Sequence, residues 1–240
     1  MDKEDGIKFC EKIPWREYIN LYTVETTLRW LIKHLMDQNP SKIIISKEIL
    51  KEAEENRKLQ IGKEEESKIP KTLYSDPLVY LDFPKHYIRI FEENWELFRP
   101  IFLHITRIKD DLKTLEPLRH NIAHMRPLRK EQKDQLNVVS RRILRHIWDY
   151  INQKYVKAAW EYEKDGFFDK AVETLEKGLK DTRNELIYEE GDPWVAYNLG
   201  KMLKNHGKLE EAKKWLNYAK INMPLDDPYR EMVEEELKNL

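Results

Sequence analysis

Apolar residues recur at steps of three and four along most of the first 154 residues. This spacing places them on one face of an α-helix. The pattern predicts helices over about Trp15 to Met36, from Ser41 or Ser46 toward Leu59, from Pro84 to Phe98, from about Ile101 through Leu118, and from about Lys130 to Lys154. The best strand candidate, Ile43-Ile44-Ile45, is short and runs into helix-forming sequence. We therefore expect an all-α fold in which residues 1–154 form a helical bundle.

Prolines mark the predicted helix ends, because a proline disfavours the helical conformation in the residue before it. Asn39-Pro40 should end the first helix, Pro100 the one after Pro84, and Pro127 the segment that follows Leu118. The stretch from Gly62 to Pro77 combines a run of charges with two prolines and little periodicity. These features predict a loop insertion near residues 60–77.

The last third of the chain contains a repeated spacing. The first set is Tyr155, Ala158, Ala159, Tyr162, Gly166, Phe168, Ala171 and Leu175; the second is Ala196, Leu199, Gly200, Leu203, Gly207, Leu209, Ala212 and Leu216. Small residues at these steps let paired helices approach closely, and the pattern resembles the tetratricopeptide repeat. The resemblance implies two helix pairs over residues 155–240, although chance spacing of unrelated helices is an alternative.

The repeat departs from that family in several ways. Tyr155 and Ala196 stand where the family often has Trp, Leu203 replaces an aromatic residue, and Arg183 replaces a proline. The step from Ala171 to Ala212 is about seven residues longer than the usual period of about 34. Seven residues are about two helical turns, so a longer helix from Lys170 toward residue 188 would preserve the packing. Because stable arrays usually have three or more repeats, we expect these two to lean on the bundle or on a second subunit.

Composition excludes several classes of function. The 43 lysines and arginines nearly balance the 44 aspartates and glutamates, so any RNA contact must come from a local basic patch. None of the 7 glycines forms a nucleotide-cradling loop, and we expect no nucleotide cofactor. The single Cys10 excludes an internal disulfide and a cysteine zinc cluster. Without a signal-like or membrane-spanning apolar run, we expect a cytoplasmic protein that does not enter a membrane.

The run from Leu118 to Leu128 is the candidate functional centre. It carries Arg119 and, five residues later, His124, near the end of a predicted long helix. Histidine titrates nearest to neutral pH and suits proton transfer. Arginine stays charged and offers a planar set of donors to phosphate oxygens. Together the two residue types offer proton transfer and a fixed positive charge.

At this motif the chain resembles a HEPN domain, over about Trp15 to Lys154. The resemblance is carried by the stripe around Trp95, by Leu112, Leu115 and Leu118, and above all by the run from Arg119 to His124. The resemblance implies a metal-independent endoribonuclease that needs no cofactor. It assigns His124 as general base or acid and Arg119 as phosphate clamp. The family often has Asn or Asp directly after the Arg, where this chain has His120, and that leaves the role of the second position open.

Four further residues are candidates for RNA binding or support. Asn121 could orient the imidazole or the substrate, and Arg126 could add phosphate affinity. Arg141 and Arg145, with Arg142, His146, Arg129 and Lys130, could form a basic strip beside the motif. A charged face of a bundle would have the same residues.

The geometry of a helix limits how Arg119 and His124 can act together. Positions five apart diverge by about 140° around a regular helix, so Arg119 and His124 should not converge within one chain. The HEPN resemblance implies a homodimer in which two motifs face each other across a composite cleft. His120 and His124 also have a metal-ligand spacing, but no third ligand is evident, so we expect no metal site.

Two functions therefore remain open. The first is a homodimeric HEPN ribonuclease, acting as a toxin, a defence effector or an RNA-processing factor, whose repeats recruit a protein partner or the RNA. The second is a non-catalytic adaptor that dimerises and binds a protein partner or RNA. In that case the Arg and His would pair internally, for example with Glu116, and Trp194, Trp215 and Tyr218 would line a binding groove or pack in a core. An open position of Arg119 and His124 would favour the first.

Overall fold

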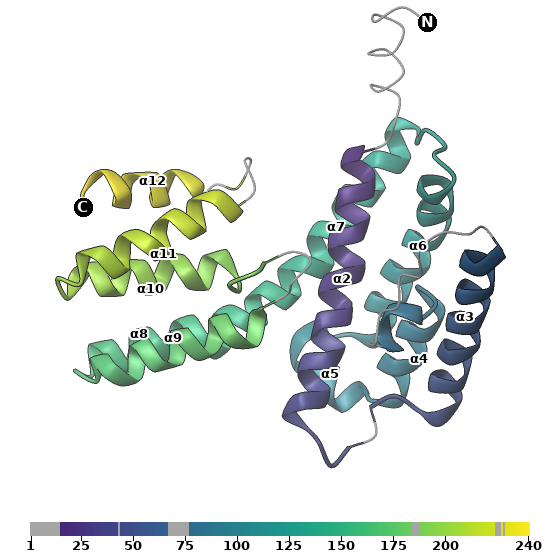
Figure 1. Ribbon diagram of the computed structural model, residues 1–240, viewed down its shortest axis with the longest axis horizontal. Helices are drawn as coiled ribbons and strands as arrows, with labels where there is room; N and C mark the ends of the chain where they lie inside the picture. Colours follow the sequence, from purple (N-terminus) through teal and green to yellow (C-terminus); the bar gives the residue numbers. More distant parts are fainter. Residues whose placement is uncertain (1–14, 43, 67–76, 184–187, 224–226, 228) are drawn as a thin grey trace, which may run out of the picture. The chain divides into compact units, whose positions relative to one another are not determined.

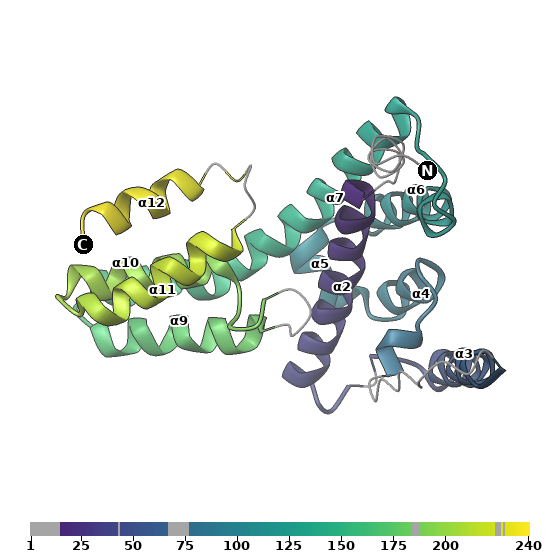
Figure 2. The same cartoon turned by 45° about the horizontal axis from the view of Figure 1, so that its top comes forward.

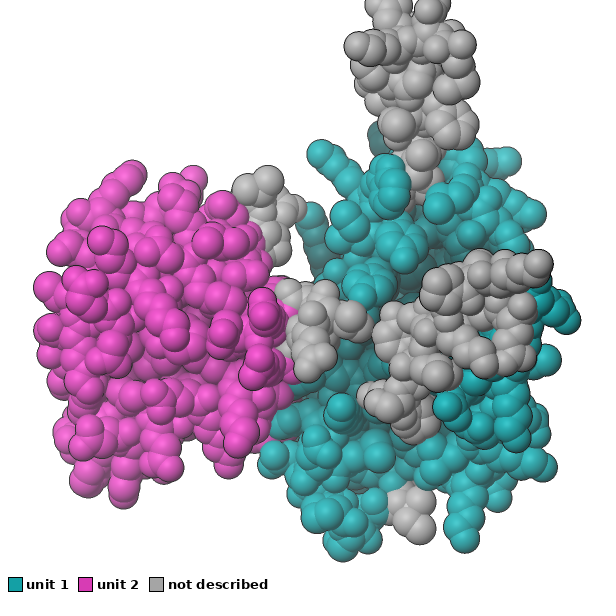
Figure 3. Space-filling model, viewed as in Figure 1, with its two compact units in different colours: residues 1–147 teal, residues 148–240 magenta. Residues whose placement is uncertain are grey.

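The computed structural model describes residues 15–42, 44–66, 77–183, 188–223, 227 and 229–240. This part of the chain is all helical and contains no strand, which confirms the predicted all-α fold class. None of its helices is both long enough and apolar enough to cross a membrane. The chain divides into two compact units, residues 1–147 and 148–240 (Figure 3), whereas the sequence placed the boundary after Lys154.

Unit 1 is a bundle around α6. Its helices are α2 (Trp15–Gln38), α3 (Lys47–Glu66), the 3-10 helix η1 (Pro77–Tyr80), α4 (Lys85–Glu93), α5 (Trp95–Phe102), α6 (Ile105–Ala123) and α7 (Lys130–Ile151), the last continuing into unit 2. α6 packs against α2, α4 and α5, and α3 packs against η1 (Figures 1 and 2). Fully buried side chains of α2, α4, α5 and α6 form its core and include Leu28, Leu31, Tyr87, Phe91, Phe98, Leu112 and Leu115.

Three predictions of local structure in unit 1 were wrong in detail. The break after α4 is at Asn94, whose amide group donates to the carbonyls of Ile44 and Ile90, and Pro100 lies inside α5. α6 begins only at Ile105, after Leu103 has adopted a left-handed conformation. The predicted loop from Gly62 is helical as far as Glu66, because α3 continues that far. The rest of that stretch up to residue 76 lies outside the described residues, as does Ile43 of the strand candidate.

Unit 2 consists of short antiparallel helices. After the π-helix η2 (Asn152–Lys157) come α8 (Ala158–Lys164), α9 (Phe168–Thr182), α10 (Pro193–Asn205), α11 (Leu209–Asn222) and α12 (Arg230–Lys238). α8 packs on α9, α10 on α11, and α12 on α11. The small residues of the repeated spacing lie at these contacts, where Ala171, Gly200 and Ala212 are buried.

The predicted extension of α9 toward residue 188 is wrong. The helix ends at Thr182, whose hydroxyl donates to the carbonyl of Gly178 and accepts the backbone N–H of Asp192. Asp192 in turn caps α10 by accepting the N–H groups of Trp194 and Val195. The extra residues of the first repeat therefore belong to the connection between α9 and α10.

The aromatic residues of unit 2 are mostly engaged with one another. Trp194 stacks on Tyr197, with ring centroids 5.2 Å apart, and packs at a tilt against Tyr229, with centroids 4.6 Å apart. Trp215 meets Tyr218 edge-on, and the Tyr218 hydroxyl donates to the carbonyl of Gly191 at 2.7 Å. These contacts favour packing over a free groove for Trp194, Trp215 and Tyr218.

Candidate functional site

The end of α6 presents the motif. The helix buries Leu118 and Ile122 and ends at Ala123, and the backbone N–H of the next residue, His124, donates to the carbonyl of His120. Met125 then adopts a left-handed conformation, with φ of 53°. Its N–H donates to the Ile122 carbonyl at 2.9 Å, and the N–H of Arg126 donates to the Asn121 carbonyl at 2.8 Å. This double closure satisfies the last carbonyls of the helix and turns the chain sharply.

Arg119 is held by α2. Its Nε donates to a carboxylate oxygen of Glu25 at 2.7 Å. The Arg119 side chain is 40% exposed and that of Glu25 is 19% exposed, so the pair lies at the edge of the bundle. The alternative partner expected from the sequence, Glu116, is not the one that Arg119 contacts.

The buried hydroxyl of Tyr87 lies beside this pair. Burial raises the pKa of Tyr87, the positive charges of Arg29 and Arg119 act to lower it, and the negative charge of Glu25 acts to raise it. The Tyr87 side chain is fully buried. Arg119 therefore contacts Glu25 close to the buried Tyr87 hydroxyl, and 40% of its side chain is exposed to solvent.

His120 and His124 form an exposed pair on the outer face of α6. Their ring centroids lie 4.6 Å apart and the rings are inclined by 62°. Both residues are exposed, as are Ala123, Met125 and Arg126. The four-residue spacing puts both imidazoles on one helix face, where solvent reaches both.

Arg119 and His124 do not converge within the chain. α6 is a regular helix across the motif, and no contact joins these two side chains in the part of the chain that the structure describes. Asn121 is half-buried and, being two residues from Arg119, leaves the helix on nearly the opposite side. The structure therefore brings His120 and His124 together, and it leaves Arg119 on a different side of α6 from both His124 and Asn121.

The predicted basic strip is only partly free. Arg126, Arg129, Lys130, Arg141 and Arg145 are exposed. His146 meets the ring of Phe102 edge-on, with centroids 6.1 Å apart. The available cations of the strip are therefore the ones at the start of α7 together with Arg141 and Arg145.

Arg142 is a correction to that strip. It forms a forked pair with Asp111, its Nε and Nη2 lying 2.8 and 2.5 Å from the two carboxylate oxygens. The hydrogen bond to Asp111 raises the pKa of Arg142, and Asp111 itself is buried. Arg142 therefore joins α6 to α7 and is not free to bind phosphate.

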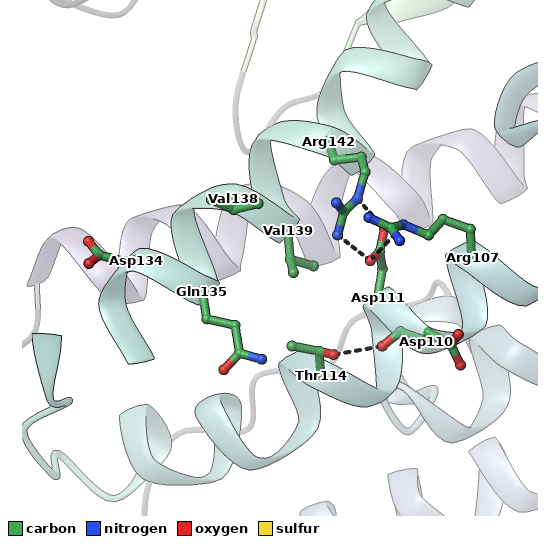
Figure 4. A pocket seen from close by; sticks show the side chains of 9 residues that line it. All are labelled: Arg107, Asp110, Asp111, Thr114, Asp134, Gln135, Val138, Val139 and Arg142. Atoms are coloured by element: carbon green, nitrogen blue, oxygen red, sulfur yellow. Dashed lines mark hydrogen bonds and ion pairs between the residues drawn. The ribbon is translucent and has the colours of Figure 1, made fainter. Parts of the chain in front are cut away.

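A cavity of about 420 Å³ lies on the other side of α6, against α7 (Figure 4). Figure 4 shows the pair of Asp111 and Arg142 at one end of it and Asp134 and Gln135 toward the other. The lining residues do not include Arg119 or His124. Sequence reasoning missed this cavity, although Asp111 interrupts the apolar positions of α6 and a charge at such a position is a sign of a buried ion pair.

Within the described residues, no group of three or more His, Cys, Asp or Glu side chains could hold a metal ion. Comparison of the chain with protein-family models, with curated proteins and with solved structures finds no match.

Proposed function

We propose that this protein is a metal-independent endoribonuclease of the HEPN type, which cleaves RNA by attack of the substrate's own 2′-hydroxyl group. The observation that carries the proposal is the exposed pair of imidazoles, His120 and His124, next to a partly exposed arginine at the end of α6. Imidazoles exchange protons near neutral pH. The guanidinium of Arg119 can meet the charge on a phosphate.

The active form would be a homodimer. Because Arg119 and His124 leave α6 in different directions, a cleft containing both is supplied by two copies of the motif facing each other. The exposed Arg126, Arg141 and Arg145 would add contacts to the RNA backbone. The helix pairs of unit 2 would recruit the RNA or a protein partner, in the manner of tetratricopeptide repeats. The role would be that of a cytoplasmic toxin, defence effector or RNA-processing hydrolase.

One comparison tests the proposal. The purified dimer and its His124→Ala form are incubated with structured RNA in the presence of a chelator, and the products are examined for 2′,3′-cyclic phosphate ends. Cleavage by the parent protein alone supports the proposal. Absence of cleavage by a verified dimer at high concentration would refute it, and equal cleavage by both proteins would assign the activity elsewhere.

A non-catalytic adaptor is the second candidate, and the ion pair of Arg119 with Glu25 favours it. An arginine that already has a carboxylate partner can serve as a strut between α2 and α6. In that case Arg119→Ala would lower the thermal stability of the protein and change neither RNA binding nor RNA cleavage.

A further inference from the structure

The two histidines of one chain are close enough to act together. Their rings are 4.6 Å apart between centroids, and both are exposed at the last turn of α6. Neither ring forms a hydrogen bond or an ion pair with another side chain in the described parts of the protein. The backbone beneath them is fixed by the helix and by the closure at Met125. Two free imidazoles on a rigid support are a suitable arrangement for two proton transfers.

Building on the proposed function, we propose that His120 is a second catalytic residue and that His120 and His124 of the same chain share the acid–base chemistry. One neutral imidazole accepts the proton of the 2′-hydroxyl while the 2′-oxygen forms its bond to phosphorus. The other, protonated, donates its proton to the 5′-oxygen as the bond from phosphorus to that oxygen breaks. The products are a 2′,3′-cyclic phosphate and a free 5′-hydroxyl, and the two imidazoles have exchanged protonation states.

The charged residues around the two histidines are compatible with one imidazole acting as the base and the other as the acid. On α6, Glu116 lies one turn before His120 on the same side of the helix and Arg119 is its sequence neighbour. Arg126 follows in the turn after His124 and is exposed. From α2, the carboxylate of Glu25 is engaged by Arg119. One neutral and one protonated imidazole are needed together, so the rate of cleavage should have a bell-shaped dependence on pH.

The test uses two substrates that differ in their leaving group. A uridine-containing dinucleotide needs a proton on its departing 5′-oxygen, whereas uridine 3′-(4-nitrophenyl phosphate) releases a stable phenolate and does not. Parent protein, His120→Ala and His124→Ala are compared on both substrates in chelator. His104→Ala is the matched control, because His104 is an exposed histidine at the opposite end of α6.

We expect both variants to lose about 100-fold or more of the rate on the dinucleotide. The variant that lacks the general acid should cleave the nitrophenyl substrate within about threefold of the parent rate, while the other stays defective on both. Free imidazole in the buffer should restore part of the lost rate, which a purely structural defect would not allow. The His104→Ala control should match the parent protein.

The outcomes separate this inference from the proposed function. If the parent protein cleaves neither substrate, the proposed function fails and the inference with it. If the parent protein cleaves RNA while His120→Ala keeps more than a third of the rate, His120 is not catalytic and the ribonuclease proposal stands. Equal losses of both variants on both substrates would overturn the assignment of one acid and one base.

Discussion

The Nε of Arg119 on α6 lies 2.7 Å from a carboxylate oxygen of Glu25 on α2, across 94 positions of sequence. The contact joins the candidate phosphate clamp to the bundle and gives it a fixed direction. It also places a competing anion beside that clamp, because a carboxylate and a phosphate are bound by the same donors of a guanidinium group.

The first prediction concerns this competition. Glu25→Gln keeps the shape of the side chain and removes its charge, so Arg119 should become more available and RNA should bind more tightly, with a steeper dependence on salt. The measurement is the Kd of a fluorescent RNA oligonucleotide between low and moderate salt. Glu17→Gln is the matched control, since Glu17 is also on α2 and pairs with Lys133 at 2.7 Å. Identical binding by the two variants would contradict the competition.

The second prediction concerns the turn after α6. Met125 holds a φ of 53°, a conformation that costs an L-residue about 1–2 kcal/mol and costs glycine little. Its side chain is 58% exposed, so little packing is lost when it is removed. Met125→Gly should therefore raise the thermal midpoint of unit 1, by a net stabilisation of about 1 kcal/mol or less after the greater flexibility of unfolded glycine is counted. Met125→Ala keeps the β-carbon and should give no gain; equal behaviour of the two variants would be evidence against the strain.

The all-α class could be predicted from the sequence, because apolar residues spaced three and four apart form the buried faces of the helices. Leu112 and Leu115 of α6 are an example. Helix ends were harder to predict. Pro100 lies inside α5, and the preceding break is stabilised by the Asn94 amide and the carbonyl of Ile44, 50 residues earlier. Such a contact has no local sequence signal.

The candidate site was also only partly predictable from the sequence. Helical geometry alone predicts that the side chains of Arg119 and His124 point in different directions, and in the described part of the chain no contact joins them. The partners of Arg119 and Arg142 could not be predicted, because Glu25 and Asp111 reach them only through the packing of α2 and α7 on α6. The closeness of His120 and His124 was implied by their spacing, but their joint exposure depended on which face of α6 the bundle buries.

The third prediction concerns the close packing of α10 on α11. A β-carbon on Gly200 would lie 2.8 Å from the Leu216 Cγ and 3.1 Å from the carbonyl oxygen of Ala212. Gly200→Ala should therefore destabilise unit 2 by about 1–3 kcal/mol. Gly62→Ala is the opposite case: Gly62 lies inside α3 and a β-carbon there meets nothing within 4 Å, so alanine should stabilise the helix by about 1 kcal/mol. Thermal or urea unfolding measures both, and a neutral Gly200→Ala would show that the two helices can separate without cost.

The contact between α3 and α4 should make unit 1 sensitive to acid. Glu52 of α3 accepts hydrogen bonds from Lys85 at 2.6 Å and Arg89 at 2.6 Å, both on α4. His86 adds a third contact at 3.0 Å between its Nε2 and the carboxylate. The His86 Nδ1 already accepts the backbone N–H of Asp82 at 2.8 Å, so Nε2 carries the proton and donates to Glu52. One carboxylate thus ties three side chains of α4 to α3.

The last prediction follows from the pKa of that carboxylate. The hydrogen bond from Lys85, followed by those from His86 and Arg89, lowers the pKa of Glu52 from 4.5 to about 2. A carboxyl group with a lowered pKa in the folded state contributes its stability above the unfolded pKa and loses it as the pH falls toward the folded one. The stability difference between the parent protein and Glu52→Gln should therefore be constant above about pH 5.5 and shrink between pH 4.5 and about 2. Urea unfolding across this range measures it, with Glu54→Gln as the control because Glu54 pairs with Arg57 of its own helix and not with α4. A difference that stayed constant down to pH 2 would mean that Glu52 acts through its shape and not through its charge.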